Sequence, residues 1–222
     1  TALLTIILSF AGALVCGLMP SSAHRRIRWV ALAFAAAGLL VSMVCCVNYS
    51  EIDGGFNKDL VNEQWIPSLK IHFIIGYDGI SLPLLLVTGL VAVCGVLFSW
   101  TLESRANQFY AFYFALIGGV YGVFLSLDLF LLFVFYEIAV VPKYFLIAIW
   151  GGARRQFAAM KLVLYSFGGS ALVLLGMLAV FFLARDASGE ALKTFSLLAL
   201  QEGQVPAAAQ QWIFPLIFVG FA

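Results

Sequence analysis

Residues 129–150 read LFLLFVFYEIAVVPKYFLIAIW, a run of 22 residues in which only Glu137 and Lys143 carry charge. A transmembrane helix needs about 20 mostly apolar residues, at ~1.5 Å per residue, to cross a hydrocarbon layer of ~30 Å. The run therefore predicts a membrane-spanning helix. Within it lie an acid, a base and, at Pro142, a residue that cannot donate a helical hydrogen bond.

The composition of the whole chain supports a polytopic membrane protein. Of its 222 residues, 64% are hydrophobic and 10% are charged, whereas soluble domains carry roughly 25% charged residues. A net charge of +1 provides no concentrated basic face, so a nucleic-acid partner is not expected. The four cysteines lie in apolar runs without metal-site spacing and are interpreted as small hydrophobic residues.

Six stretches are long and apolar enough to span a membrane. We predict spanning helices at residues 2–19, 29–47, 80–100, 109–127, 129–150 and 157–183. A seventh apolar stretch begins at Trp212 and reaches Ala222, about 16 Å of helix, so we expect the sequence to stop within a span. The predicted fold class is all-α: a polytopic membrane helical bundle with six complete transmembrane helices plus the start of a seventh.

The loop at residues 48–79 contains a strand-like pattern. In SLKIHFII, residues 68–75, apolar side chains alternate with Lys70 and His72, which is the period of a half-buried strand. We therefore predict a short β element in this loop. Asp78 or Ser81 is expected to cap the first turn of the helix that follows.

The distribution of basic residues predicts the orientation, because Lys and Arg near span ends favour the cytoplasmic side. One side holds seven of them, and the other holds four together with most of the acids. We therefore place the N-terminus and loop 48–79 outside, and the chain in a bacterial inner (plasma) membrane as a multi-pass protein. The seven are Arg25, Arg26, Arg28, Arg105, Arg154, Arg155 and Lys161; the four are Lys58, Lys70, Arg185 and Lys193.

Two local patterns near the fourth and fifth spans indicate packing and capping. Gly118, Gly119 and Gly122 give small-residue spacing that favours close helix contact. Asp128 precedes the apolar run in a very short turn. It is expected to cap the fifth helix, and the alternative is a charge at the mouth of an ion path.

Glu137 is the candidate functional residue. It is the ninth residue of its span, about 12 Å along the axis from Leu129, too deep for its side chain to reach the headgroups. A charge there costs at least about 2.5–3.5 kcal/mol on insertion scales, whereas one interhelical hydrogen bond returns only about 0.6–2 kcal/mol. Glu137 must therefore be paired, hydrated or neutral, which favours a role in proton transfer over a purely structural one.

Three further residues belong to the candidate site. Pro142 leaves the carbonyl of Ile138 without its helical donor, which gives either a packing kink or a hydrated break. Lys143 lies about 120° around the helix from Glu137, so it either snorkels toward the headgroups or joins a proton chain. Lys161 is either a basic flank of the sixth span or a group that faces Glu137.

The motifs of the chain resemble a known family. The stretches are YDGISLPLLLVTGL at 77–90, GVFLSLDLFLLFVFYEIAVVPKYFLIAIWGG at 122–152 and AAMKLVLYSFGGS at 158–170. They are similar to the antiporter-like proton-pumping subunits of respiratory NADH:quinone oxidoreductase (complex I), and among these to subunit M. The matching text runs in order through nearly the whole chain.

The resemblance implies roles for particular residues. Glu137 corresponds to the fifth-helix glutamate that is thought to exchange protons with a lysine on the seventh helix, and Lys161 to a lysine at the start of the sixth helix. The family usually has Met where this chain has Lys143, and Trp is common where it has Tyr136. Residues 1–108 would form three N-terminal helices with the outer loop, and residues 109–222 an incomplete first antiporter-like repeat.

By the same resemblance, the chain would be a membrane subunit of a proton-pumping NADH:quinone oxidoreductase. Glu137 would alternate between protonated and ionised states as a neighbouring charge changes. Flavin, iron-sulphur clusters and quinone would sit on partner subunits, with no cofactor on this chain, and neighbouring antiporter-like subunits in the lipid bilayer would be its partners. The alternatives are a subunit of a multi-protein cation/proton antiporter and a truncated, non-conducting scaffold.

Overall fold

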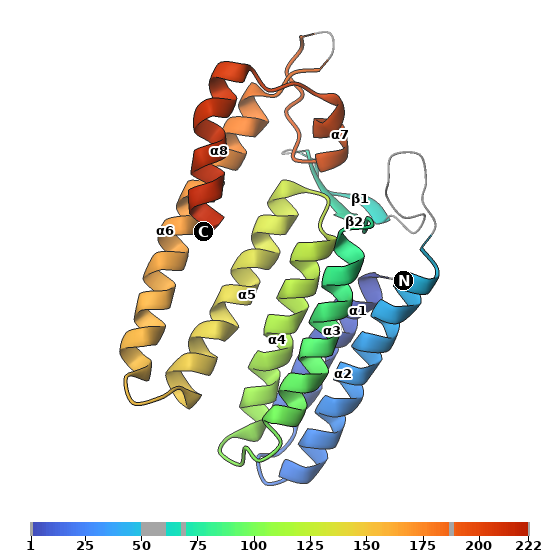
Figure 1. Ribbon diagram of the computed structural model, residues 1–222, viewed down its shortest axis with the longest axis vertical. Coiled ribbons are helices and arrows are strands. Elements are labelled where there is room, and N and C mark those ends of the chain that lie inside the picture. Colours follow the sequence, from blue (N-terminus) through green and yellow to red (C-terminus); the bar gives the residue numbers. More distant parts are fainter. Residues whose placement is uncertain (1, 50–60, 68–69, 187–188, 222) are drawn as a thin grey trace.

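Eight helices and two strands make up the part of the chain that the computed structural model describes, residues 2–49, 61–67, 70–186 and 189–221 (Figure 1). The helices are α1 (Leu3–Leu18), α2 (His24–Val47), α3 (Ser81–Phe98), α4 (Ala106–Leu125), α5 (Leu129–Trp150), α6 (Arg155–Leu183), α7 (Leu197–Glu202) and α8 (Ala207–Phe221). The strands are β1 (Val61–Ile66) and β2 (Ile71–Ile75).

The predicted all-α membrane bundle is confirmed. Five helices, α2 to α6, are long and apolar enough to cross a membrane, and α1 and α8 are apolar but shorter, with 16 and 15 residues. The two largest boundary differences from the sequence prediction are at helix starts. Helix α2 begins at His24 instead of Trp29, so the arginines before Trp29 are helical, and α8 begins at Ala207 instead of Trp212. The short helix α7 was not predicted.

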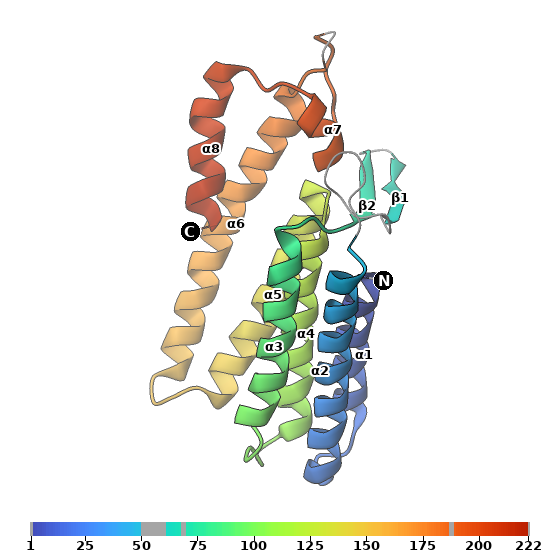
Figure 2. The same ribbon diagram turned by 45° about the vertical axis from the view of Figure 1, so that its right-hand side comes forward.

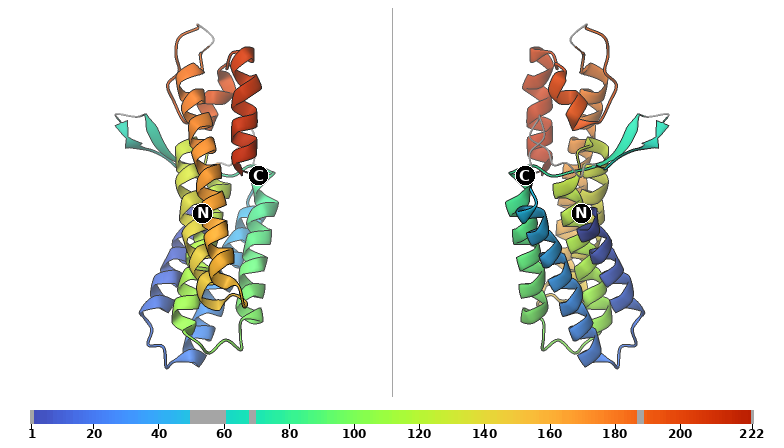
Figure 3. Two further views of the ribbon diagram at one scale, coloured as in Figure 1. Left: turned by 90° about the vertical axis from the view of Figure 1, so that its left-hand side faces the viewer. Right: turned by 90° about the vertical axis from the view of Figure 1, so that its right-hand side faces the viewer.

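The long helices run alternately up and down (Figures 1 and 2). The α1–α2, α3–α4 and α5–α6 connections lie at one end of the bundle, and the hairpin and the connection after α6 lie at the other. Helix α4 contacts α1, α2, α3 and α5, whereas α8 packs against α6 at the side of the bundle (Figure 3). This order brings α5 between the α1–α4 group and the α6–α8 pair.

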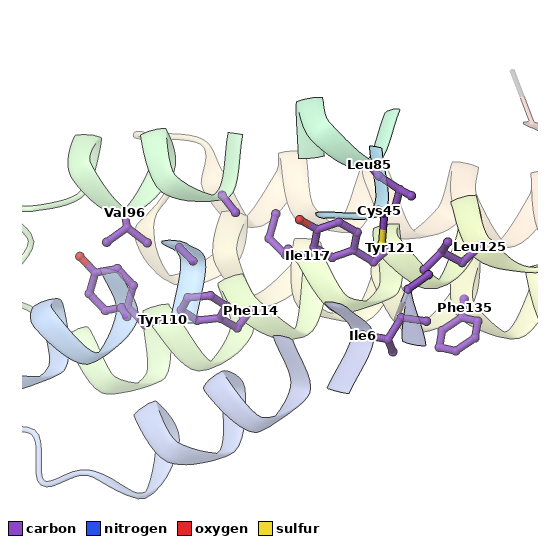
Figure 4. Close-up of a cluster of buried hydrophobic side chains, with 14 of the residues drawn as sticks. Ile6, Cys45, Leu85, Val96, Tyr110, Phe114, Ile117, Tyr121, Leu125 and Phe135 are labelled. Atoms are coloured by element: carbon purple, nitrogen blue, oxygen red, sulfur yellow. The ribbon is translucent and has the colours of Figure 1, made fainter. Parts of the chain in front are cut away.

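Helix α4 supplies the centre of the core. Tyr110, Phe114, Ile117, Tyr121 and Leu125 are buried along it at intervals of three and four residues (Figure 4). That spacing keeps the side chains on adjoining faces of one helix. The only polar atoms in this stripe are the two tyrosine hydroxyls, and both have partners: Tyr121 lies 3.3 Å from the hydroxyl of Ser42, and Tyr110 donates to the carbonyl of Ser99.

The glycines of α4 permit close helix contact, as the sequence predicted. A Cβ atom on Gly122 would lie 2.2 Å from the ring of Phe135 on α5, and one on Gly119 would lie 2.9 Å from the Cβ of Ala139. A Cβ on Gly118 would lie 3.2 Å from atoms of α1. Helix α4 therefore packs against both neighbours through small residues, as membrane helices commonly do.

The loop after α2 contains an antiparallel hairpin. Val61 pairs with Ile75, and the register shifts between Gln64 and Ile66. The predicted β element is confirmed over β2, while its first two residues, 68 and 69, lie outside the described residues. Strand β1 was not predicted, because VNEQWI lacks a clear alternation of apolar and polar residues.

Candidate functional site

Glu137 lies on α5 where that helix faces α6. It is partly buried, and its Oε1 is hydrogen-bonded to the hydroxyl of Ser170, a buried residue of α6. The same hydroxyl lies 2.7 Å from the backbone carbonyl of Ser166, one helical turn earlier. The deep carboxyl group therefore has a polar partner on the neighbouring helix, and that partner has a second acceptor of its own.

The two contacts of Ser170 are chemically informative because a serine hydroxyl carries one hydrogen. If Glu137 is ionised, the carboxylate accepts that hydrogen and the carbonyl of Ser166 loses it. If Glu137 is protonated, its own O–H donates to Ser170, which then donates to Ser166. Both contacts are satisfied at once only in the protonated form, so the state of Glu137 determines where the hydrogen of Ser170 points.

A hollow of about 580 Å³ lies beside this contact, between α5, α6 and α8. Tyr136, the residue before Glu137, lines it together with Tyr165, Ser166 and the backbone of Gly169. Ser166 thus joins the hollow to the hydrogen-bonded pair.

The structure does not bring the two predicted lysines to Glu137. Lys161 is exposed in the second turn of α6, with its Nζ 5.5 Å from the ring centroid of Tyr165. Lys143 is partly buried and makes no hydrogen bond or ion pair with any described residue. Lys161 and Tyr165 line a second hollow, of about 630 Å³, which shares Leu164 and Tyr165 with the hollow beside Ser166.

Pro142 is buried within α5, and the helix continues through it to Trp150. Neither a sharp end nor a restart of the helix marks this position. The proline therefore removes one hydrogen-bond donor from an otherwise continuous helix.

Asp128 caps α5, which confirms the capping interpretation. Its Oδ1 accepts hydrogen bonds from the backbone N–H groups of Phe130 and Leu131, at 2.9 and 3.1 Å. Its Oδ2 accepts from the backbone N–H of His72 on β2, at 3.3 Å. Because the side chain has no exposed surface, burial raises the pKa of Asp128, and these hydrogen bonds lower it only in part.

The turn around Asp128 connects three parts of the chain. The N–H of Leu127 donates to the carbonyl of Ile74 in β2, at 3.0 Å. The N–H of Leu129 donates to the carbonyl of Phe195, and the N–H of Leu197 donates to the carbonyl of Leu127, at 2.8 and 2.9 Å. The hairpin, the start of α5 and the connection after α6 are therefore held together at one point.

Two features of the site were not predicted from the sequence. Ser170 was overlooked because serine is common in membrane helices, and its only signal was a spacing of four from Ser166 on the helix that follows Glu137. No sequence pattern predicted the hydrogen bonds between Phe195 and the start of α5. They depend on how the connection between α6 and α7 packs against the rest of the chain. Within the described residues, no group of three or more His, Cys, Asp or Glu residues could hold a metal ion.

The described residues thus form a polytopic helical membrane bundle with a hydrogen-bonded carboxyl group between two spanning helices, a feature found in membrane proteins that move protons or ions. Comparison with known proteins agrees with this class. The family model described as "NADH:quinone oxidoreductase/Mrp antiporter, TM" matches residues 126–222. That part of the chain belongs to this family, and the chain as a whole is homologous to chain 4 of NAD(P)H-quinone oxidoreductases, as the sequence motifs indicated.

Two relatives illustrate the homology. NAD(P)H-quinone oxidoreductase chain 4 3 of Picosynechococcus sp. is 34% identical over 211 residues, which are 94% of this chain and 37% of that protein. The chloroplastic chain 4 of Chlorokybus atmophyticus is 34% identical over 223 residues, 98% of this chain and 41% of that protein. The chain thus spans about two fifths of the length of these relatives.

A solved structure supports the fold. A chain of respiratory complex I from Thermus thermophilus with bound NADH superimposes with a TM-score of 0.85 and 23% identity, covering 100% of this chain and 43% of that one. This likeness establishes the arrangement of the helices.

Proposed function

We propose that this chain is part of a membrane subunit of a proton-pumping NADH- or NAD(P)H:quinone oxidoreductase, and that Glu137 carries the proton within it. The observation that carries the proposal is the hydrogen bond between Glu137 on α5 and Ser170 on α6. The names of the chain 4 relatives support the assignment to such an oxidoreductase. An intramembrane acid with a polar partner and a nearby hollow is the kind of group that marks proton paths.

The contact provides a switch with two states. A proton on Glu137 completes the chain from Glu137 through Ser170 to the carbonyl of Ser166, and its loss turns the Ser170 hydroxyl toward the carboxylate. Moving one charge against about 150 mV requires about 3.5 kcal/mol. A change of charge close to Glu137 in a poorly solvated region can supply energy of that size, whereas a screened surface charge cannot.

The lysines receive distinct roles in this proposal. Lys161 lies beside Tyr165, whose side chain borders both hollows, so Lys161 would exchange protons at the entrance of a path through Ser166 to Glu137. Lys143 lies six residues beyond Glu137 on α5, about 9 Å along the axis. It would act on Glu137 through its charge and not by direct contact.

The remaining expectations complete the assignment. Flavin, iron-sulphur clusters and quinone would be bound by partner subunits, and the immediate neighbours would be other antiporter-like membrane subunits. We place the chain in a bacterial inner membrane, with its N-terminus and loop 48–79 outside. Residues 1–108 would form a three-helix N-terminal unit, and residues 109–222 the first part of an antiporter-like repeat.

The test uses the complete oxidoreductase in proteoliposomes, with NADH oxidation and proton uptake recorded together. Glu137→Gln is expected to lower the number of protons moved per NADH, and Ser170→Ala is expected to lower it less. Thr88→Ala is the matched control, because Thr88 also donates within the membrane but only to a carbonyl of its own helix, that of Leu84. A Glu137→Gln complex that pumps at the normal ratio would falsify the proposal.

A second candidate is a subunit of a multi-protein cation/proton antiporter, because the description of the matching family also names Mrp antiporters. Such a complex would transport ions without a redox partner. Purification of the tagged full-length protein from its native membrane discriminates the two. Co-purifying NADH-oxidising subunits support the oxidoreductase, and their absence together with sodium- or potassium-dependent proton movement supports the antiporter.

A further inference from the structure

A cluster of basic side chains surrounds a hollow at the start of α2. The hollow has a volume of about 690 Å³ and lies between the α1–α2 and α3–α4 connections. Arginines at positions 25, 26 and 28 line it with His24, and Glu103 is the only acid in the lining. Three arginines against one glutamate leave an excess of positive charge, and no ion pair joins Glu103 to these arginines in the described part of the chain.

Two nitrogen atoms in this cluster are buried without a hydrogen-bond partner among the described residues. They are Nδ1 of His24 and Nε of Arg28. The guanidinium of Arg28 is held in place because its Nη2 donates to the carbonyl of Leu102, at 3.0 Å. A buried donor without an acceptor is destabilising, so a ligand with acceptor oxygens would be stabilised here.

The first turn of α2 adds to the attraction for an anion. No side chain caps this helix at Ala23, and free N–H groups at a helix start favour negative charge. The arginine guanidinium matches the oxygens of a phosphate in pairs. The hollow is therefore suited to a phosphate group.

Tryptophans place the hollow at the depth of lipid headgroups. Trp29 and Trp100 pack edge to face with ring centroids 5.4 Å apart, and the indole N–H of Trp150 donates to the carbonyl of Ser104, at 2.9 Å. All three lie at the end of the bundle that carries the hollow, which is where aromatic belts meet the interface. Trp29 is 56% exposed, so the helix that carries the arginines also presents an aromatic ring outward from the bundle.

We propose that this cluster binds the phosphate of an anionic phospholipid headgroup. Arg25 and Arg26 would contact the phosphate from the exposed side, and Arg28 and His24 would contact it from within the hollow. A membrane lipid is favoured over a soluble anion because the cluster lies in one layer with the tryptophans. A lipid with a net negative charge is favoured over a zwitterionic one because the lining is positive overall.

The test measures lipid binding by native mass spectrometry of the purified full-length protein or its complex after delipidation. Phosphatidylglycerol, phosphatidylcholine and inorganic phosphate are the probes. Each basic residue near an anionic membrane surface changes affinity about fivefold, so Arg25→Gln/Arg26→Gln is expected to bind phosphatidylglycerol roughly 30-fold more weakly. The matched control is Arg154→Gln/Arg155→Gln, an arginine pair at the start of α6 that lines none of these hollows.

Each outcome decides the proposal. A large loss in the Arg25/Arg26 variant, with retained binding in the control and in Arg25→Lys/Arg26→Lys, supports it. An equal loss in the control shows a general effect of surface charge and overturns it. Equal binding of phosphatidylcholine, or displacement of phosphatidylglycerol by millimolar inorganic phosphate, overturns the assignment to an anionic lipid. Thermal unfolding of each variant in detergent identifies a folding defect. If Arg25→Gln/Arg26→Gln is misfolded, the lipid preference of Arg25→Lys/Arg26→Lys decides the proposal instead.

Discussion

Replacing Asp128 separates two contributions of its buried carboxyl group: the hydrogen bonds that it accepts and the charge that it carries. The side chain accepts from two N–H groups in the first turn of α5 and from the N–H of His72. Asp128→Ala removes all three acceptors. Asp128→Asn keeps one acceptor oxygen for the first turn of α5, replaces the oxygen that accepts from His72 with an NH2 group, and removes the charge. Asparagine is as good an N-cap as aspartate.

The expected magnitudes follow from these contacts. Loss of an N-cap costs about 0.5–2 kcal/mol, typically about 1. The longer contact with His72 adds part of the 1–3 kcal/mol that an orphaned donor costs, because water has no access to the fully buried Asp128 position. We therefore expect Asp128→Ala to lower the free energy of unfolding by about 2–3 kcal/mol. Asp128→Asn should lower it by less, about 1–2 kcal/mol, because the asparagine keeps the helix cap but its NH2 group cannot accept from His72.

The assay is equilibrium unfolding of the full-length protein in mixed micelles, followed by tryptophan fluorescence and circular dichroism. The pH dependence adds a second test. Since burial raises the pKa of Asp128, the folded state holds this proton more tightly than the unfolded state. Its contribution to stability is present below the unfolded pKa and is lost as pH rises through the raised folded pKa. The stability of Asp128→Asn relative to the wild type should therefore increase with pH over that interval.

Asp78 provides a comparison, because the pH dependence of its contribution to stability has the opposite sign. Its partial burial raises the pKa, but hydrogen bonds, including one from the N–H of Ser81 at 2.8 Å, outweigh burial and lower the pKa overall. Its contribution is present above the unfolded pKa and is lost as pH falls through the lowered folded pKa. Equal stability of wild type and Asp128→Ala, or the same pH trend for Asp128→Asn and Asp78→Asn, would refute the reasoning.

Three further predictions test packing, orientation and the lysine of α5. Gly122→Ala should destabilise the protein by about 1–3 kcal/mol, because its Cβ would meet an α5 ring at 2.2 Å. Gly168→Ala, with no atom within 4 Å of the new Cβ, should be neutral or slightly stabilising in the same unfolding assay. An impermeant maleimide should label Gly152→Cys only from the cytoplasmic side and Glu190→Cys only from the outside; labelling of both from one side contradicts the predicted topology. Lys143→Met should lower proton pumping by more than about twofold, because it removes the charge that is proposed to act on Glu137; a loss within about twofold would contradict that role.

The fold was predictable from the sequence wherever composition decides it. The spans of α3 to α6 follow from apolar length, and the cap at Asp128 and the close contact at Gly122 follow from short local patterns. The start of α2 was placed five residues too late because arginines were taken as the end of the span. They continue the helix because their charges sit at the interface, where a helix can extend beyond the hydrocarbon layer.

The site was predictable only in part, because a sequence identifies an acid within a spanning helix but not the residue that faces it on the neighbouring helix. Glu137 stood out as a charge in an apolar run. Its partner could not be predicted, since the residue of α6 that faces it depends on the crossing and offset of two helices. Spacing along one helix excluded a direct bond between Glu137 and Lys143, and the structure agrees.

The Asp128 cap and the Glu137–Ser170 contact are structurally linked through α5 and α6. Asp128 fixes the first turn of α5, and the turn beside it is bonded to Phe195 in the connection that follows α6. Both helices that carry the Glu137–Ser170 contact are thus tied near the same point, about 14 Å along α5 from Glu137. Weaker hydrogen bonds at this turn would let α6 shift relative to α5. A displacement of about 1 Å is enough to break a hydrogen bond between two side chains. If this coupling operates, Asp128→Ala will lower the proton-to-NADH ratio at temperatures where the protein remains folded, and Asp128→Asn will not.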